Sequence, residues 1–247
     1  MKYCNVLALN GSPRKQNSNT RRLLDPFLAG ARQAGAKTET LYTAELAIKD
    51  CVGCFTCWKR TPGCCIHKDD MPLVLEKIRQ ADLVVWATPL YHYGMTASMK
   101  RLLERTLPLV KPYIVNKGGH YGHPSRYGEH PANFLISNCG FPEQMHFEAL
   151  TQQMNQLSHE SPLVGAITCT TGEVLGYMDF AWYLEAMERA GREVVEQGKV
   201  SAETAAVLAK NLIPLEAFLS VANASWNVPG DIAPTLEEAL RGDTASK

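Results

Sequence analysis

The sequence has no excess of charge of either sign and no long hydrophobic run. Its 25 lysine and arginine residues balance 25 aspartate and glutamate residues, and no local basic run changes this balance. Nucleic acids and anionic membranes attract positively charged surfaces, so we expect neither as a partner. No window approaches the length and apolar content of a membrane span.

The first residues lack a recognisable targeting signal. The segment MKYCNVLALNGSPR holds only a short apolar run, which polar, glycine and proline residues follow at once. A secretory signal peptide needs a longer apolar region and a cleavage site of small residues. We therefore expect a cytoplasmic protein. In that compartment thiols stay reduced, so clustered cysteines indicate metal or redox chemistry before structural disulfides.

Several common catalytic and nucleotide-binding motifs are also missing. The first glycine-containing loop has neither G-x-G-x-x-G nor the P-loop lysine pattern. Ser12 does not lie in the G-x-S-x-G turn of hydrolases, and we recognise no catalytic triad. We expect no amino-acid side chain to act as a catalytic nucleophile or base.

The composition is that of a globular protein. The chain has 247 residues, of which 45% are hydrophobic, and this is enough to bury one sizeable core. We find no internal repeat and no low-complexity linker. The sequence therefore predicts a single domain over residues 1–247, with a core over about 1–171.

Apolar runs alternate with segments of helical periodicity along this core. The apolar runs predict strands at 5–9, 38–42, 82–87, 132–137 and 163–170. The intervening segments predict helices at 20–34, 70–80, 96–106 and 142–159. Several runs are continuously apolar, as is typical of parallel strands that are covered on both faces. The pattern predicts an α/β fold with a doubly wound parallel sheet and helices on both faces.

Two further segments depart from this alternation. Residues 108–131 are rich in glycine, proline, histidine and tyrosine without a clear period, which predicts a long functional or interface excursion. Its tyrosines, Tyr113, Tyr121 and Tyr127, could cover a site on a second subunit or close over their own subunit as a lid. Residues of about 172–240 predict a helical C-terminal extension without strands.

The excursion also contains histidines that could bind a metal ion. They are His120, His123 and His130. Histidines scattered along a loop are more often solvated or hydrogen-bonded, so we consider a catalytic metal there the weaker interpretation.

A polar loop follows the first predicted strand, where open α/β folds bind their ligands. Its sequence LALNGSPRKQNSNT supplies hydroxyl, amide and guanidinium groups from Ser12, Arg14, Ser18, Asn19 and Thr20. Together with free N–H groups at a helix N-terminus, these groups suit a phosphate dianion. The alternative is an ordinary helix cap within a polar loop.

Two more loops leave strand ends at the same predicted edge. They are residues 88–95, TPLYHYGM, and residues 137–141, SNCGF. Aromatic side chains, a proline-fixed turn and glycines with free N–H groups fit a flat heteroaromatic ring whose edge needs hydrogen bonds. The alternative is that Tyr91 and Tyr93 pack at the start of a helix.

Five of the eight cysteines fall within the fifteen residues CVGCFTCWKRTPGCC. Cys51, Cys54 and Cys57 follow the spacing C-x2-C-x2-C, which lets one loop wrap three corners of an iron-sulfur cubane. A fourth thiol follows at Cys64 or Cys65. Zinc, a reversible dithiol and simple packing remain alternatives.

These motifs together carry a resemblance over roughly the first 170 residues. GSPRKQNSNT, ATPLYHYGMTASMKRLLER and CVGCFTCW…CCIHKDDM resemble the flavodoxin-like NAD(P)H-dependent FMN reductases, and specifically their iron-sulfur flavoprotein branch. The resemblance implies a five-stranded flavodoxin-like sheet of order 2-1-3-4-5 and tightly bound FMN. It also implies a homodimer or homotetramer in which the flavin lies near a subunit interface.

The resemblance further implies a role for each matching residue. It assigns the FMN phosphate to Ser12, Arg14, Ser18, Asn19 and Thr20. It assigns the flavin ring to Pro89, Leu90, Tyr91, Tyr93 and Gly94, with the less closely matched Ser137, Cys139 and Gly140. Lys100 matches the family's lysine on the following helix. Counted back from the DDM motif, Cys65 takes the position of the fourth ligand, beside Cys51, Cys54 and Cys57, of a [4Fe-4S] cluster.

The function that follows is that of an FMN-dependent oxidoreductase. It would take hydride from NAD(P)H and pass electrons to an acceptor that the sequence does not name, in this branch through the cluster. The alternative is an electron-transfer protein that holds flavin and cluster for a protein partner. The sequence does not distinguish NADH from NADPH.

Overall fold

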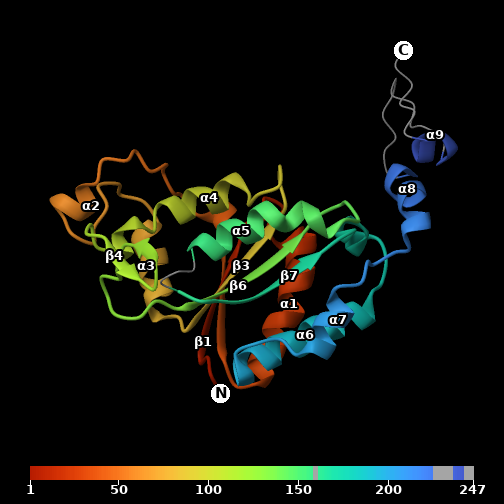
Figure 1. Ribbon diagram of the computed structural model, residues 1–247, viewed down its shortest axis with the longest axis horizontal. Helices are drawn as coiled ribbons and strands as arrows, with labels where there is room; N and C mark the ends of the chain where they lie inside the picture. Colours follow the sequence, from red (N-terminus) through yellow and green to blue (C-terminus); the bar gives the residue numbers. More distant parts are fainter. Residues whose placement is uncertain (158–160, 225–235, 242–247) are drawn as a thin grey trace, which may run out of the picture.

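A five-stranded parallel sheet forms the centre of the molecule (Figure 1). The computed structural model describes residues 1–157, 161–224 and 236–241. The strands are β1 (Asn5–Asn10), β2 (Lys37–Tyr42), β3 (Leu83–Pro89), β6 (Ala132–Asn138) and β7 (Leu163–Cys169). Their order is β2-β1-β3-β6-β7, and Val85 at the centre pairs with Ala8 and Phe134. The predicted flavodoxin-like order 2-1-3-4-5 is confirmed.

Helices cover both faces of the sheet (Figure 1). One face carries α1 (Asn19–Gln33), α6 (Ala181–Gln197) and α7 (Ala202–Leu208). The other carries α3 (Met71–Gln80), α4 (Ala97–Glu104) and α5 (Glu148–Leu157). Every residue of β3 and β6 is buried as a result, which explains why both strands are mainly apolar. The end of the helix predicted to reach His159 lies outside the described residues.

The remaining elements are short. They are the helix α2 (Thr56–Lys59), the C-terminal helices α8 (Leu215–Ala224) and α9 (Leu236–Arg241), and the 3-10 turns η1 (Lys15–Asn17), η2 (Thr43–Glu45), η3 (Leu107–Leu109), η4 (Gln144–Phe147) and η5 (Gly172–Gly176). In the part of the chain that the structure describes, no helix is long and apolar enough to cross a membrane.

The close crossing of α1 and α6 depends on two glycines. A Cβ atom at Gly30 would lie 1.8 Å from the carbonyl oxygen of Glu188, and one at Gly191 would lie 1.8 Å from the carbonyl oxygen of Phe27. The two helix backbones therefore touch. Side chains of α6 such as Tyr183 and Val194 are fully buried in the same core as α1.

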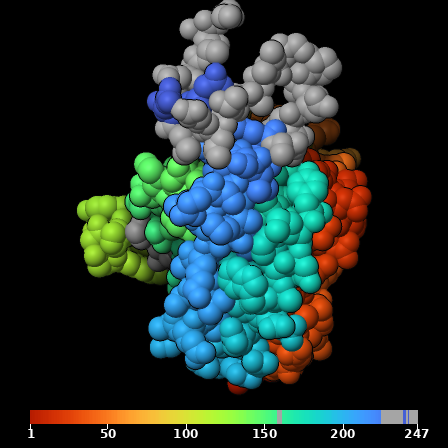
Figure 2. Space-filling model, turned by 90° about the vertical axis from the view of Figure 1, so that its right-hand side faces the viewer, coloured from red at the N-terminus to blue at the C-terminus, as the bar shows by residue number. Residues whose placement is uncertain are grey.

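The segment predicted as a C-terminal extension thus contributes to the main core. Its first helix, α6, completes one face of the sheet, and α7 adds Leu208 to the same core cluster. Figure 2 shows the teal-to-blue chain that includes α6 and α7 over the middle of one side of the molecule. The sequence predicted its helical content correctly but not this role, because helical periodicity does not identify the surface against which a helix packs.

The excursion at 108–131 contains an antiparallel hairpin, β4 (Val115–Lys117) with β5 (His120–Gly122). Gly118 and Gly119 form its turn with φ of 58° and 90°, a conformation that favours glycine. The ring of His123 lies 4.7 Å from that of Trp58, and Arg79 lies over Tyr127 at 4.1 Å. The excursion therefore packs against α2 and α3 of its own subunit.

Candidate functional site

Three loops meet at the carboxyl edge of the sheet, after β1, β3 and β6. The amide of Gly11 donates to the carbonyl oxygen of Ala87 at 2.7 Å, and Thr96 Oγ1 donates to that of Gly11 at 2.7 Å. The amide of Leu90 donates to the carbonyl oxygen of Asn138 at 2.8 Å. These hydrogen bonds fix the three loops relative to one another, as expected for a ligand site at this edge.

The polar side chains after β1 divide into structural groups and one exposed group. Ser18 caps α1 by accepting from the amide of Arg21 at 3.1 Å, and Thr20 Oγ1 donates to Asn138 Oδ1 at 2.8 Å. Asn19 Nδ2 donates to the carbonyl oxygen of Glu173 at 3.2 Å. These three side chains and Ser12 are buried, and they shape the loop.

The groups that remain for a ligand at this loop are backbone amides and Arg14. The first-turn amides of Asn19 and Thr20 have no acceptor within their own helix, because the helix begins there. The side chain of Arg14 is exposed and lies 3.7 Å from the Glu173 carboxylate. A helix N-terminus beside a mobile guanidinium can bind a phosphate dianion.

The loop after β3 is a tight turn that displays two tyrosines. Tyr91 and Gly94 exchange backbone hydrogen bonds of 2.9 and 3.0 Å, and the two residues between them, His92 and Tyr93, have φ of 47° and 63°. Such left-handed geometry costs roughly 1–2 kcal/mol per residue outside glycine. The side chains of Tyr91 and Tyr93 are 46% and 56% exposed, so neither is packed away at the start of α4. Strained residues held in this way are common at ligand sites.

The loop after β6 contributes backbone and neighbouring aromatic groups. Ser137 is buried, and its Oγ donates to the carbonyl oxygen of Thr88 at 2.8 Å. Cys139 is also buried, which raises the pKa of its thiol to about 11. Gly140 has open space around it. Only Gly140 of these three predicted residues presents its backbone to the edge, whereas Ser137 and Cys139 support the loop.

His146 and Glu143, which sequence reasoning missed, extend this edge beside the predicted Phe141. The ring of His146 lies 5.1 Å from that of Phe141 and 5.7 Å from that of Tyr93, and its Nε2 lies 3.0 Å from a Glu143 carboxylate oxygen. These contacts join two loops that are about 50 residues apart in sequence. The stretch FPEQMHF carries no motif that predicts them. The predicted Lys100, in contrast, pairs with Glu104 on the surface of α4.

Of the four predicted thiols, Cys57 is the buried one and lies in α2. Burial raises the pKa of the Cys57 thiol, and the neighbouring Cys65, Cys54 and Cys51 raise it further through like charge. Cys64 is exposed and is not among the groups that act on Cys57. All eight cysteines are free thiols. The residue types of this segment suit a group that binds several thiolates, and Cys65 rather than Cys64 is among the thiols that influence Cys57.

The sulfur atoms of this segment do not lie close enough together to coordinate a metal ion in this arrangement. Within residues 1–157, 161–224 and 236–241, no three histidine, cysteine, aspartate or glutamate side chains are grouped closely enough to hold a metal ion. The histidines of the excursion are included in that statement. His123 instead packs on Trp58 and lies 3.2 Å, through Nδ1, from the carbonyl oxygen of Tyr113.

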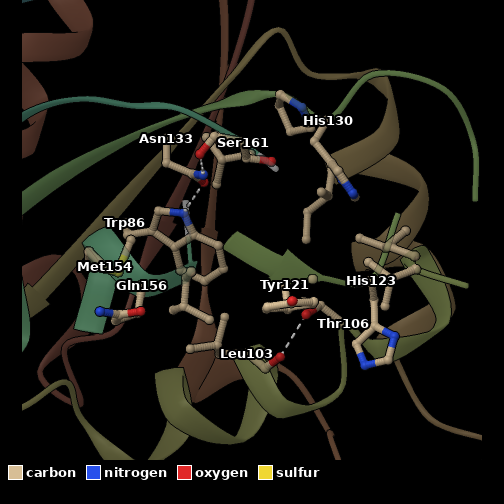
Figure 3. A pocket seen from close by; sticks show the side chains of 17 residues that line it. Trp86, Leu103, Thr106, Tyr121, His123, His130, Asn133, Met154, Gln156 and Ser161 are labelled. Atoms are coloured by element: carbon tan, nitrogen blue, oxygen red, sulfur yellow. Dashed lines mark hydrogen bonds between the residues drawn. The ribbon is translucent and has the colours of Figure 1, made fainter. Parts of the chain in front are cut away.

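An apolar cavity of about 330 Å³ lies apart from these loops (Figure 3). Trp86 and Met154 line it, and the Trp86 indole N–H donates to Asn133 Oδ1 at 2.8 Å. Tyr121 and His123 of the excursion close its other side. The cavity adjoins the first halves of β3 and β6, whereas the predicted cofactor residues follow the ends of these strands. None of the predicted cofactor or cysteine residues lines it.

Comparison with known proteins agrees with the motifs. Residues 4–120 match the family model described as NADPH-dependent FMN reductase. An iron-sulfur flavoprotein of Archaeoglobus fulgidus is 39% identical over 101 residues, covering 41% of this chain and 48% of the relative. Another from the same organism is 31% identical over 142 residues, covering 57% of this chain and 58% of the relative. The chain thus spans about half the length of the curated relatives it matches.

A solved structure supports the fold over a longer region. The NAD(P)H:quinone oxidoreductase from Methanothermobacter marburgensis superposes with a TM-score of 0.57, covering 78% of this chain and 96% of that protein at 15% identity. At this identity the similarity establishes the flavodoxin-like fold alone. The family match is independent of it and spans the loop after β1, the cysteine segment and the loop after β3. Residues 4–120 are therefore similar to the NADPH-dependent FMN reductase family, and the relatives that the chain matches are iron-sulfur flavoproteins.

Proposed function

We propose that the protein is an FMN-dependent oxidoreductase that takes hydride from NAD(P)H and passes electrons to a second acceptor. The observation that carries this proposal is the meeting of three loops at one edge of the sheet, within and next to the family-matched residues. One loop offers amides and a guanidinium for a phosphate, and the next displays two exposed tyrosines for a flat ring.

In this proposal the chain binds and orients the cofactor, and FMN supplies the redox chemistry. Arg14 and the amides of Asn19 and Thr20 hold the phosphate. Tyr91 and Tyr93 contact the ring, and the backbone of Gly140 supplies a hydrogen bond to its polar edge, while Leu90 and Gly94 use their amides to hold the turn. No side chain has to accept or donate a proton as a catalyst, which agrees with the absence of a recognisable triad.

The nicotinamide would approach from the open side of this edge. The sequence contains no separate dinucleotide-binding motif for the nicotinamide cofactor. The space above the flavin ring is therefore the available site. Several large apolar side chains around the edge are exposed, among them Tyr177 at 74%. Surfaces of this kind are usually covered. We propose a homodimer or homotetramer in which the partner's excursion provides part of that cover.

We further propose that Cys51, Cys54, Cys57 and Cys65 hold a [4Fe-4S] cluster, which would let electrons leave one at a time. The support is the C-x2-C-x2-C spacing of Cys51, Cys54 and Cys57 with Cys65 soon after, and the names of the relatives as iron-sulfur flavoproteins. A zinc ion is the alternative for four thiolates. The eight free thiols suit a reducing, cytoplasmic compartment.

Cofactor extraction followed by anaerobic reduction tests the function. The proposal predicts release of FMN on extraction, and rapid bleaching of the flavin absorption by NADH or NADPH. Release of FAD, or failure to bind FMN after reconstitution, contradicts it. Flavin that a strong chemical reductant bleaches but neither nicotinamide does would favour the alternative, an electron-transfer protein that serves a protein partner.

A further inference from the structure

The cysteine loop, residues 50–68, is closed at its base by paired backbone segments. The amide of Ala47 donates to Asp70 Oδ2 at 2.7 Å, and the amide of Asp70 donates to the carbonyl oxygen of Ala47 at 3.1 Å. The amide of Lys49 donates to Asp69 Oδ2 at 3.0 Å. The residues before the first cysteine and those after the last are thus held together.

A buried cation, Arg105, lies at this base. Its Nη1 donates to Asp69 Oδ2 at 2.7 Å and to the carbonyl oxygen of Lys49 at 2.6 Å, and its Nη2 donates to Asp69 Oδ1 at 3.2 Å. The side chains of Arg105 and Asp69 are 1% and 3% exposed. Burying both charges is unfavourable unless each is fully paired, so this arrangement is a specific feature of the loop.

The Arg105 guanidinium also faces the cysteines. Its Nε is buried and has no hydrogen-bond acceptor. One N–H donor of the guanidinium therefore remains for another group. Burial tends to lower the pKa of Arg105, but Asp69 and the nearby Cys65 thiol raise it above its ordinary value. The Cys65 sulfur is a neighbouring acceptor for this donor, and a hydrogen bond from a charged donor is stronger than one from a neutral donor.

We propose that Arg105 is a positioning residue of the cysteine loop. It joins the two ends of the loop through Asp69 and Lys49, and its Nε remains as a donor for the neighbouring Cys65 sulfur. It thereby sets a fixed positive charge beside any group that the four thiolates bind. The part of this proposal that concerns bound iron rests on the proposed cluster, whereas the closing of the loop does not.

The same helix supplies a matched control. Arg101 lies one turn before Arg105 on α4 and also contacts the loop base, where its Nε donates to Asp50 Oδ1 at 2.7 Å. This pair is exposed, with side-chain exposures of 41% and 80%. Exposed ion pairs contribute little to stability. Arg101→Met therefore removes a nearby cation but keeps the buried ion pair between Arg105 and Asp69.

The experiment compares Arg105→Met, Arg105→Lys and Arg101→Met with the unaltered protein, each with far-UV circular dichroism and thermal unfolding as the measure of correct folding. Because Arg105→Met leaves the Asp69 carboxylate buried without a cation, it is also made together with Asp69→Asn. Hydrogen exchange of residues 50–68 is measured before iron is added. Iron per chain and the reduction potential are measured after anaerobic reconstitution.

We expect exchange in the loop to become about tenfold faster or more in both Arg105→Met proteins, since the loop then opens locally. We expect less iron and a lower reduction potential, because loss of a nearby positive charge disfavours the reduced state. Arg105→Lys should keep a reduction potential near that of the unaltered protein. Arg101→Met should change neither the exchange rate of the loop nor the reduction potential.

Loop exchange that is unchanged in both Arg105→Met proteins would overturn the proposal. So would a reduction potential that falls equally in Arg101→Met. If the unaltered protein binds no iron, the cluster part of the proposed function fails, and hydrogen exchange alone then decides the role of Arg105.

Discussion

Arg14 differs from the other polar side chains of its loop because it is exposed. Its contact with Glu173 is an exposed ion pair, which contributes little to folding. We therefore expect Arg14→Ala to weaken FMN binding about tenfold, as loss of a charge-assisted hydrogen bond does, without lowering the melting temperature. Fluorescence titration with FMN measures this. Arg22→Ala, at an exposed position on the first turn of α1, is the control, and equal weakening there would point to a general charge effect.

Asp69 should make the protein sensitive to acid. Burial alone would raise the pKa of this carboxyl, but hydrogen bonds from Arg105 and from the Lys49 and Met71 amides lower it to about 2. Because the folded-state pKa lies below the ordinary value, the carboxylate stabilises the fold above about pH 4, and this contribution disappears as the pH falls through about 2. The carboxylate contributes about 2 kcal/mol to the free energy of unfolding.

Urea unfolding of the unaltered protein and of Asp69→Asn, at a series of pH values, measures this contribution. We expect the difference in free energy of unfolding to be largest near neutral pH and to shrink as the pH falls from about 4 towards 2. A difference that stays constant over this range would show that the Asp69 charge does not matter.

At the scale of elements, the crossing of α1 and α6 is the most sensitive contact. A methyl group at Gly191 would overlap the carbonyl oxygen of Phe27, which is backbone and cannot move aside as a side chain could. We expect Gly191→Ala to cost about 3 kcal/mol or more, because the helices must separate and leave poorly packed side chains behind. Gly140→Ala, with open space around it, should cost little. Thermal unfolding compares the two, and equal stability would contradict the close crossing.

The elements differ in how well sequence alone could predict them. Strands β1, β3, β6 and β7 were predictable because their apolar runs are bounded by loops. The hairpin of β4 and β5 was not, because three-residue strands without a buried face leave no period to detect. The contact between Tyr93 and His146 was not predictable either, since it arises only when loops after different strands meet.

The candidate site was predicted at the level of loops better than at the level of side chains. Sequence motifs identified the three loops that the structure brings to one edge. They gave Ser18, Asn19 and Thr20 the same role as Arg14, although the first three are buried and hydrogen-bonded within the protein. Which side chain points inward depends on tertiary packing, and a motif does not contain that information.

At the scale of the whole molecule, two exposed aromatic regions predict self-association. One lies at the carboxyl edge and includes Tyr177, and the other lies on the excursion and includes Tyr121, which is 75% exposed. We expect light scattering to report a dimer or tetramer, and we expect Tyr177→Glu and Tyr121→Glu each to reduce the mass. Leu73→Glu, at an exposed position on α3, should not. A monomer at micromolar concentration would support the alternative that the excursion serves only its own subunit.

The visible absorption spectrum of the anaerobically purified protein, recorded before and after addition of NADPH or NADH, tests the central claim most directly. The account predicts flavin bands that bleach rapidly with at least one nicotinamide, over a broad iron-sulfur shoulder if the four thiolates hold a cluster. A protein that shows no flavin bands even after reconstitution with FMN, or whose flavin neither nicotinamide reduces, would contradict it.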